Sequence, residues 1–274
     1  MKNPNEDFKR ITVDQNLFDT IRRKNAFICD MDGVLYHGNR LIPGAKDFIE
    51  WLKREKKKFL FLTNSSERSP QELADKLQRL GIDVDKEHFY TSALATAEFL
   101  ASQKPGGSAY IIGEAGLINA LYNVGYTIND VNPDYVVVGE ARTYNLEVLT
   151  HSVNLVRRGA RLVGTNPDIT GPVEKGIMPA TGALVKPIEL ATGKKCYFVG
   201  KPNPLMMRTA LKKLGCVREE TAIIGDRMDT DILAGVETEM DTVLVLSGVT
   251  SSEEIDTYAY RPKIVINDVG DFAR

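Results

Sequence analysis

Short apolar runs alternate with amphipathic runs along most of the chain. An early example is the apolar run AFIC at residues 26–29, which is followed by a segment from Ala45 to about Glu55 whose apolar residues recur at helical spacing. Short apolar runs predict buried strands, and helical spacing predicts amphipathic helices that pack on them. The alternation therefore predicts an α/β fold, built from βα units around a largely parallel sheet.

The same pattern continues toward the C-terminus, and local signals mark two helix starts. Ser69 and Glu72 have the spacing of a capping box, so we expect a helix from about residue 70 that ends near Gly81. Asn203, directly before a proline, predicts another helix start. The other predicted elements are strands 59–62, 110–113, 135–139, 161–165, 197–199, 222–224, 242–246 and 264–266, and helices 115–124, 145–158 and 230–238.

Composition narrows the class of protein. The 274 residues include 35 basic and 37 acidic side chains, a net charge of −2, whereas nucleic-acid and membrane-surface binders usually carry a basic excess. No apolar stretch approaches the roughly 18 residues of a membrane span. The charged first 25 residues lack the apolar centre of a secretion signal, and the three cysteines form no CxxC pair. We therefore expect a cytoplasmic globular protein.

Polar side chains follow four of the predicted strands. They are Asp30 with Asp32, Thr63 with Asn64, Lys201, and Asp226 with Asp231. Ligands of open parallel sheets bind outside the carboxyl ends of the strands, so we expect these side chains to converge. Carboxylates that converge repel one another, and the oxygen-preferring cation Mg²⁺ would relieve that repulsion. The hydroxyl, amide and ammonium groups of the set are suited to binding a phosphate.

Each motif alone also fits a structural role. A DxD pair can form a turn, a single lysine can lie on the surface, and an acidic segment such as 226–231 can begin a helix. All four motifs in this order, each after an apolar strand, favour one common site. Two other hydrolase signatures are absent, because no Cys is followed six residues later by Arg and Ile177 stands where a phosphate-binding Walker loop needs Lys.

At these motifs the sequence resembles the haloacid dehalogenase (HAD) superfamily of phosphotransferases. The matching segments are DMDGVL at 30–35, TNSS at 63–66, KPNP at 201–204 and GDRMDTD at 225–231. Segments 165–168, 179–184 and 198–207 are similar to the NagD type, the ribonucleotide monophosphatases with a large α/β cap. The similarity extends over about residues 26–270. It implies a Rossmann-like parallel-sheet core with an inserted α/β cap domain of type II.

The resemblance also implies a role for each matching residue. Asp30 looks like the nucleophile that forms an aspartyl-phosphate, and Asp32 like the general acid and base. Mg²⁺ would bind the side chains of Asp30 and Asp226 and the backbone carbonyl of Asp32, with Asp231 in the outer shell. The residues implied to bind and stabilise the transferring phosphoryl group are Thr63, Asn64 and the catalytic Lys201.

The long segment between Thr63 and Lys201 predicts a second domain. A βαβ crossover needs only a few dozen residues, and this segment has its own strand–helix pattern. We expect a catalytic core of residues 25–81 and 194–274, a cap of residues 82–193 and an N-terminal extension of residues 1–24. Cap loops 140–145, 165–168 and about 173–181 are candidates for contact with the leaving group. The candidate specificity residues are Arg142, Asn166, Asp168 and Thr181.

Together these features predict a Mg²⁺-dependent phosphomonoester hydrolase whose partner is a small phosphorylated metabolite, with no nucleic-acid or membrane partner. Nucleoside 5′-monophosphates such as UMP are the first candidate substrates. A broad phosphatase of sugar phosphates or pyridoxal 5′-phosphate is the nearest alternative. Phosphomutase and dehalogenase chemistry stay open within the superfamily. A non-catalytic sensor of a phosphorylated metabolite is a further alternative, against which the complete set of motif residues argues. The sequence does not indicate an oligomeric state.

Overall fold

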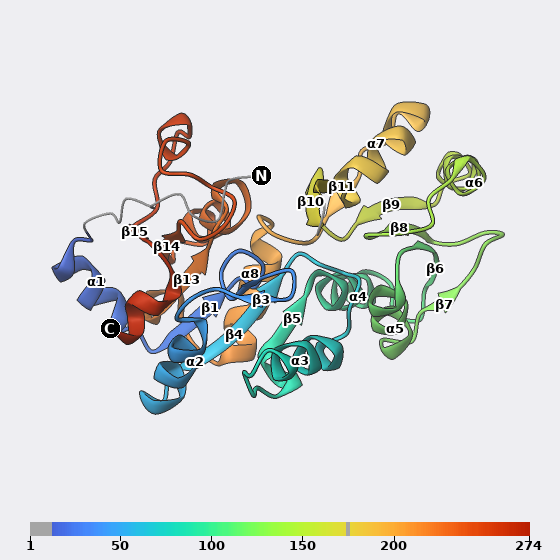
Figure 1. The fold of residues 1–274 in the computed structure, drawn as a ribbon. Coiled ribbons are helices and arrows are strands. Elements are labelled where there is room, and N and C mark those ends of the chain that lie inside the picture. Colours follow the sequence, from blue (N-terminus) through green and yellow to red (C-terminus); the bar gives the residue numbers. More distant parts are fainter. Residues whose placement is uncertain (1–12, 174–175) are drawn as a thin grey trace. The chain divides into compact units, whose positions relative to one another are not determined.

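The computed structural model describes residues 13–173 and 176–274, which divide into two compact units (Figure 1). Among these residues, unit 1 contains 13–62, 76–84 and 207–274, and unit 2 contains 63–75 and 85–206 without the gap. Unit 1 shares most of its residues with the predicted core and unit 2 with the predicted cap. The chain passes from one unit to the other at positions that differ from the predicted domain boundaries. Those boundaries stay a prediction. Residues 1–12 of the predicted extension lie outside the described residues.

Unit 1 is built on a parallel sheet. Five of its strands lie in the order β15-β14-β13-β1-β4, and each neighbouring pair is parallel. Their bounds are β1 Ala26–Cys29, β4 Lys58–Thr63, β13 Thr221–Gly225, β14 Asp241–Val245 and β15 Ile264–Ile266. Cys29 at the end of β1 lies opposite Phe61 and Ile224. Because parallel neighbours end at the same edge, the residues that follow β1 and β13 come close together.

Helices and short turns complete unit 1. They are α1 Gln15–Arg22, α2 Ala45–Arg54, η2 Arg218–Glu220, η3 Met228–Ile232, α9 Leu233–Glu237, η4 Ile255–Thr257 and η5 Val269–Ala273, with the hairpin of β2 Tyr36–His37 and β3 Arg40–Leu41. The chain passes between the units within α3 (Pro70–Arg79) and α8 (Pro204–Leu214). Within the described part of the chain, no helix is long and apolar enough to cross a membrane.

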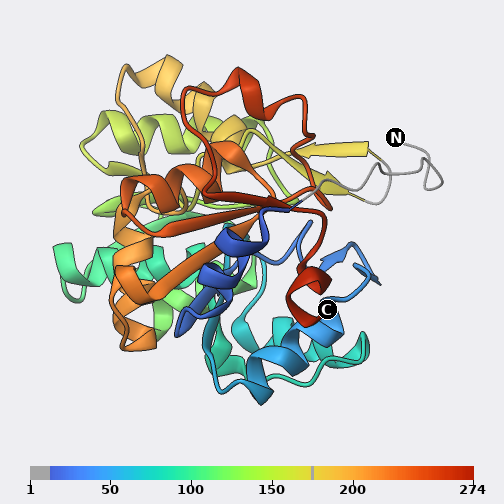
Figure 2. The same ribbon diagram turned by 90° about the vertical axis from the view of Figure 1, so that its left-hand side faces the viewer.

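An aromatic cluster ties both ends of the described chain to the core of unit 1. The ring of Phe272 in η5 lies 5.0 Å from Phe18 of α1, 5.3 Å from Trp51 of α2 and 5.6 Å from Phe27 of β1, between ring centroids. Figure 2 shows η5, in red, beside the blue helix α2. Aromatic pairs at these distances add to the free energy of burial. Residues 15–22 of the predicted extension are therefore a packed helix of unit 1.

Unit 2 has a parallel sheet of its own, in the order β12-β9-β8-β6-β7. In Figure 1, helices α4 and α5 lie on one face of this sheet and α6 and α7 on the other. The strands are β6 Ser108–Ile112, β7 Thr127–Ile128, β8 Tyr135–Val138, β9 Arg161–Gly164 and β12 Tyr197–Phe198. The helices are α4 Ser92–Gln103, α5 Ala115–Asn123, α6 Leu146–Arg157 and α7 Thr181–Thr192. Outside the sheet lie η1 Lys86–His88, β5 Phe89–Thr91 and the hairpin of β10 Thr170–Val173 and β11 Gly176–Pro179.

The predicted α/β alternation and the capping box are confirmed. The Ser69 N–H and hydroxyl each donate to Glu72 Oε2 at 2.8 Å, and the Glu72 N–H donates to Ser69 Oγ at 3.3 Å. A helical run ending at Gly193 is borne out by α7, whose C-cap is Gly193, but the sequence pattern did not predict helices α1 and α4, the start of α7 or the two hairpins. For α4 and α7 the reason is that their buried residues do not form a narrow apolar stripe, so their periodicity is weak.

Candidate active site

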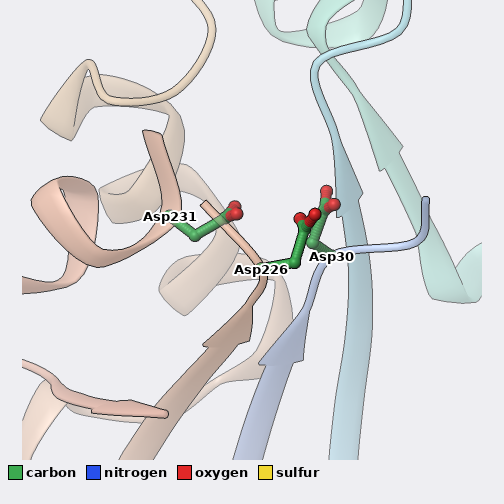
Figure 3. Close-up of side chains that lie close together, drawn as sticks. All are labelled: Asp30, Asp226 and Asp231. Carbon is green, nitrogen blue, oxygen red and sulfur yellow. The ribbon is translucent and has the colours of Figure 1, made fainter. Parts of the chain in front are cut away.

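Three carboxylates meet at the carboxyl edge of the unit 1 sheet. Asp30 follows β1, Asp226 follows β13, and Asp231 points toward them from η3 (Figure 3). One oxygen of each carboxylate lies within 4.8 Å of an oxygen of the other two. Asp226 and Asp231 are buried and Asp30 is half-buried. Like charges this close repel one another, so the arrangement favours a bound cation.

The backbone around Asp226 leaves its carboxylate little freedom. The Val249 N–H donates to Asp226 Oδ2 at 2.7 Å, and the Thr250 N–H donates to the Asp226 carbonyl at 3.1 Å. A Cβ atom at Gly33 or Gly248 would lie 2.3 Å or 2.0 Å from Asp226 Oδ2. Gly33 also has a φ of +80°, which side-chain-bearing residues rarely adopt. Any larger residue at Gly33 or Gly248 would therefore clash with the Asp226 carboxylate in its present position.

A π-helical turn carries Asp231. The predicted helix 230–238 begins as the π-helix η3, in which the Ile232 N–H donates to the Arg227 carbonyl at 3.1 Å, and then continues as α9. The Arg227 N–H also donates to Asp231 Oδ2 at 3.2 Å. A Cβ at Gly225 would lie 2.2 Å from the Asp231 carboxyl carbon. Such turns are frequent at functional sites, and this one brings Asp231 to the other two acids.

Asp32, the predicted general acid and base, is not one of the three clustered acids. Its side chain is 47% exposed, and its Oδ1 lies 3.8 Å from His37 Nδ1. His37 Nε2 contacts the Ser247 carbonyl at 2.6 Å, and its pKa is raised, chiefly by the neighbouring Asp32 carboxylate. A carboxylate with this exposure can exchange protons with water, as acid–base catalysis requires.

The predicted phosphate-binding residues belong to unit 2. The Lys201 N–H donates to Asn64 Oδ1 at 2.8 Å, and Asn64 Nδ2 donates to the Lys201 carbonyl at 3.0 Å and to Asp168 Oδ2 at 3.1 Å. Thr63 Oγ1 accepts from the Ser65 N–H at 3.1 Å. The Asn64 amide therefore holds the backbone of Lys201, and its direct contact with a phosphate stays a prediction.

The acidic cluster of unit 1 and the Asn64–Lys201 pair of unit 2 are two separate parts of the predicted site. Thr63 links them along the chain, since it is the last residue of β4, the neighbour of β1 in the unit 1 sheet. That both parts act on one phosphate is part of the proposal below.

The four predicted specificity residues differ in their surroundings. Arg142 is 69% exposed, and its guanidinium lies 3.6 Å from Glu67 Oε2. Asn166 and Thr181 are fully buried, and Thr181 Oγ1 lies 3.2 Å from Thr165 Oγ1. These two side chains have the contacts of structural residues, whereas Arg142 is open to a ligand. Contact of any of the four, Asp168 included, with a leaving group stays a prediction. Residues 174–175 of the third candidate loop lie outside the described residues.

Two residues near these sites received no role from the sequence. One is Val249, whose backbone N–H binds Asp226; the other is Glu140, which accepts hydrogen bonds from Ser66 and Asn166. Glu140 follows closely after the apolar strand β8, so the signal that identified Asp30 was present there, whereas Val249 lies further from the end of β14. A backbone donor has no side-chain signature, and Glu140 was included only as one end of a candidate loop.

The donor set of the acidic cluster fits Mg²⁺. Hard carboxylate oxygens from Asp30 and Asp226 approach each other with Asp231 beside them. Mg²⁺ in proteins is usually held by one or two carboxylates together with waters and a substrate phosphate. Asp30 and Asp226 would therefore hold the ion directly, as predicted.

Comparisons with known proteins agree with this geometry. Residues 27–127 match the family model described as haloacid dehalogenase-like hydrolase, and residues 198–272 match a second HAD-hydrolase-like model. The chain is 47% identical over 248 residues, 90% of each chain, to a dihydroxyacetone phosphatase of Corynebacterium glutamicum. It is 45% identical over 244 residues, 89% of this chain and 96% of the relative, to the ribonucleotide monophosphatase NagD of Escherichia coli K12. It is also 38% identical over 252 residues, 92% of this chain and 97% of the relative, to an acid sugar phosphatase of Staphylococcus aureus.

Solved structures give the same result. The structure of NagD from E. coli K-12 superposes with a TM-score of 0.85 at 44% identity, covering 90% of this chain and 98% of NagD. A p-nitrophenyl phosphatase from Archaeoglobus fulgidus has a TM-score of 0.86 at 36% identity, with 91% and 98% covered. The predicted fold class, a Rossmann-like parallel-sheet core with an additional α/β part, is thereby confirmed. The chain belongs to the haloacid dehalogenase-like hydrolases of the NagD type.

Proposed function

We propose that this protein is a Mg²⁺-dependent phosphatase of small metabolites that works through an aspartyl-phosphate on Asp30. Its general activity, that of a phosphoric monoester hydrolase, follows from its family, whose three relatives above are all named phosphatases. The metal dependence and the aspartyl-phosphate mechanism are supported by the close approach of Asp30, Asp226 and Asp231 at the sheet edge. A nucleophile beside a cation site is what phosphoryl transfer to a carboxylate needs.

Asp30 and Asp32 divide the covalent and acid–base work. The Asp30 carboxylate attacks phosphorus in line and the bond to the alcohol oxygen breaks. Asp32 donates a proton to that leaving oxygen. It then accepts a proton from the water that hydrolyses the aspartyl-phosphate and restores Asp30.

The other residues stabilise the charge of the transferring group. Lys201 supplies a fixed positive charge and Thr63 a hydroxyl donor, while the Asn64 amide holds Lys201 in place. Preorganised groups of this kind commonly lower the barrier by about 3 kcal/mol each. Mg²⁺ at Asp30 and Asp226 would offset the negative charge shared by the phosphate and the carboxylates.

The substrate proposed first is a nucleoside 5′-monophosphate. It is supported by the similarity to NagD, which extends over 96% of that ribonucleotide monophosphatase. A triose or sugar phosphate is the second candidate, favoured by the 47% identity to a dihydroxyacetone phosphatase. Arg142 is an exposed cation that could contact a polar leaving group of either kind. We also propose a cytoplasmic setting without a nucleic-acid or membrane partner, consistent with the net charge of −2.

The test is phosphate release by the purified protein from nitrophenyl phosphate, UMP, dihydroxyacetone phosphate and glucose 6-phosphate, with Mg²⁺ and with EDTA. We expect Mg²⁺-dependent release, with Asp30→Asn as the inactive control. Absence of release from every ester would reject the phosphatase, and full release in EDTA would reject the metal requirement alone. The ratio of kcat/KM between UMP and the two sugar phosphates decides between the substrate candidates.

A further inference from the structure

Glu140 is a half-buried acid in the loop after β8 that the mechanism above does not use. Its Oε2 accepts from the Ser66 N–H at 2.9 Å and from the Ser66 hydroxyl, and its Oε1 accepts from Asn166 Nδ2 at 2.9 Å. The Glu140 N–H donates back to Ser66 Oγ at 3.2 Å. Burial raises the pKa of Glu140, and these hydrogen bonds oppose that shift. Both carboxylate oxygens are therefore occupied by donors from other segments of unit 2.

Glu140 joins three loops that are far apart in sequence. Ser66 lies in the loop after β4, Glu140 in the loop after β8 and Asn166 in the loop after β9. Asn166 Nδ2 also donates to the Asn64 carbonyl at 2.7 Å. The loop after β4 is thus held at two points. Glu140 binds Ser66 directly, and the Asn166 amide, which Glu140 also binds, holds the Asn64 carbonyl.

The loop held by Glu140 begins directly after Thr63 and contains the Asn64 amide that binds both backbone groups of Lys201. We propose that Glu140 is a positioning residue, which keeps this loop where Asn64 fixes Lys201 for phosphate binding. The proposal rests on the proposed function, in which Thr63 and Lys201 contact the transferring phosphoryl group.

Stability alone does not account for an acid at this place. Burying a carboxylate costs more free energy than burying a neutral side chain of similar size, even when it is hydrogen-bonded. Glu140 accepts on both oxygens, from Ser66 and from Asn166, whereas an amide offers a single acceptor oxygen, so the acid holds both partners where an amide would not. Rigidity of the loop after β4 is a benefit to catalysis rather than to folding.

Neighbouring backbone approaches this loop closely at two glycines. A Cβ at Gly139 would lie 2.6 Å from Ser66 Oγ, and one at Gly200 would lie 2.5 Å from the Thr165 carbonyl and 2.7 Å from Asn64 Oδ1. Displacement of a catalytic group by about 1 Å can slow a reaction by about a hundredfold. A loosened contact at Glu140 is therefore expected to reach the reaction rate through Asn64.

The first test compares Glu140→Gln with Glu147→Gln, the same chemical change at an exposed position in the first turn of α6. Glutamine keeps the length of the side chain, but its NH₂ must face a donor of Ser66 or Asn166. We expect kcat for both UMP and nitrophenyl phosphate to fall about 10- to 100-fold, with KM changed by less than about threefold. Glu140→Ala is expected to be slower still, and Glu147→Gln should match the wild type.

The second test is a double-mutant cycle with Lys201→Ala. If Glu140 acts through Lys201, adding Glu140→Gln to Lys201→Ala should slow the reaction by less than about threefold. A residue that affects the rate independently of Lys201 would multiply the two effects instead, and one that only stabilises the fold would leave kcat unchanged. All variants are assayed well below their melting temperatures. Asn166→Ser, which removes the amide link to the Asn64 carbonyl, replaces Glu140→Gln if that variant does not fold.

The outcomes separate this proposal from the proposed function. Glu140→Gln with kcat within twofold of the wild type, or with an effect that multiplies that of Lys201→Ala, overturns the positioning role while the phosphatase stands. A wild type without phosphatase activity, or an active Asp30→Asn variant, overturns the proposed function itself.

Discussion

The acidic cluster of unit 1 and the Glu140 network of unit 2 are both groups of polar side chains at the carboxyl ends of parallel strands. Around Glu140, each carboxylate oxygen receives hydrogen bonds from Ser66 or Asn166. In the cluster, Asp226 and Asp231 each accept a backbone N–H as well, but the carboxylates of Asp30, Asp226 and Asp231 also approach one another. The Glu140 network is complete within the protein, whereas the cluster gains from a cation. We therefore expect the cluster to bind a ligand and the Glu140 network to position the loop after β4.

The largest effect is expected from Asp30→Asn, which removes the attacking charge with almost no change in shape. Activity on every ester should fall by about five to six orders of magnitude, as for other nucleophile substitutions. The variant should melt in EDTA at the wild-type temperature or above, because one repelling charge is gone. Phosphate release and a thermal melt check both parts. Retention of a tenth of the wild-type activity would show that Asp30 is not the nucleophile.

Metal removal tests the cluster directly. We expect EDTA to abolish turnover, Mg²⁺ to restore it, and excess Ca²⁺ to inhibit, because Ca²⁺ tolerates longer and bidentate carboxylate contacts that suit in-line attack poorly. Mg²⁺ at about 100 times its Kd should stabilise the wild type by about 2.7 kcal/mol, and Asp226→Asn should lose this gain.

Calorimetry with and without Mg²⁺ measures that stabilisation independently of activity. An equal Mg²⁺-dependent rise in Tm for wild type and Asp226→Asn would place the ion elsewhere.

Lys201→Ala should slow all phosphate esters by a similar factor, about 100- to 1,000-fold, because each presents the same transferring group. The matched control is Lys195→Ala, at an exposed position after α7, which should be neutral. Values of kcat/KM for UMP and nitrophenyl phosphate decide the point. A strong slowing of one ester but not the other would show that Lys201 recognises the leaving group rather than the transferring phosphate.

Arg142→Ala should change the preference among substrates rather than the chemistry. A lost polar contact costs about 1–3 kcal/mol, so UMP should be slowed about five- to a hundredfold and nitrophenyl phosphate much less. Remote contacts help only substrates large enough to reach them. Equal slowing of both esters would mean that the exposed loop around Arg142 does not select among substrates.

The smallest expected effect is on stability and its pH dependence in unit 2. Asp134 forms an ion pair with Lys104 and accepts from the Ser108 N–H at 2.9 Å, and its pKa is lowered, chiefly by Lys104. A lowered pKa stabilises the fold above the unfolded pKa, near 4, and this stabilisation is lost as pH falls through the folded value. Asp134→Asn should therefore cost about 1 kcal/mol near neutral pH and less near pH 3, where the unfolded carboxyl is protonated.

Urea unfolding at both pH values measures this difference. Asp85→Asn, at an exposed position in the same unit, is the control and should show neither effect. A cost that stays constant down to pH 3 would show that the carboxylate charge of Asp134 does not contribute.

Much of the fold was determined by sequence alone, because the signals are local. Apolar runs placed β1 and β13, and the Ser69 capping box placed the start of α3. The positions of Asp30, and of Asp226 with Asp231, after strands identified the three clustered acids. Each signal depends on a few consecutive residues whose backbone conformation and burial follow from their own side chains.

The tertiary structure decided what depends on residues far apart in the chain. It placed β1 between β13 and β4, turned Asp231 toward Asp226 through a π-helical turn, and brought Glu140 to Ser66 and Asn166. No local pattern specifies such contacts. They form because buried polar groups must find donors and acceptors wherever the packing of sheets and helices brings them, and that packing depends on the whole chain at once.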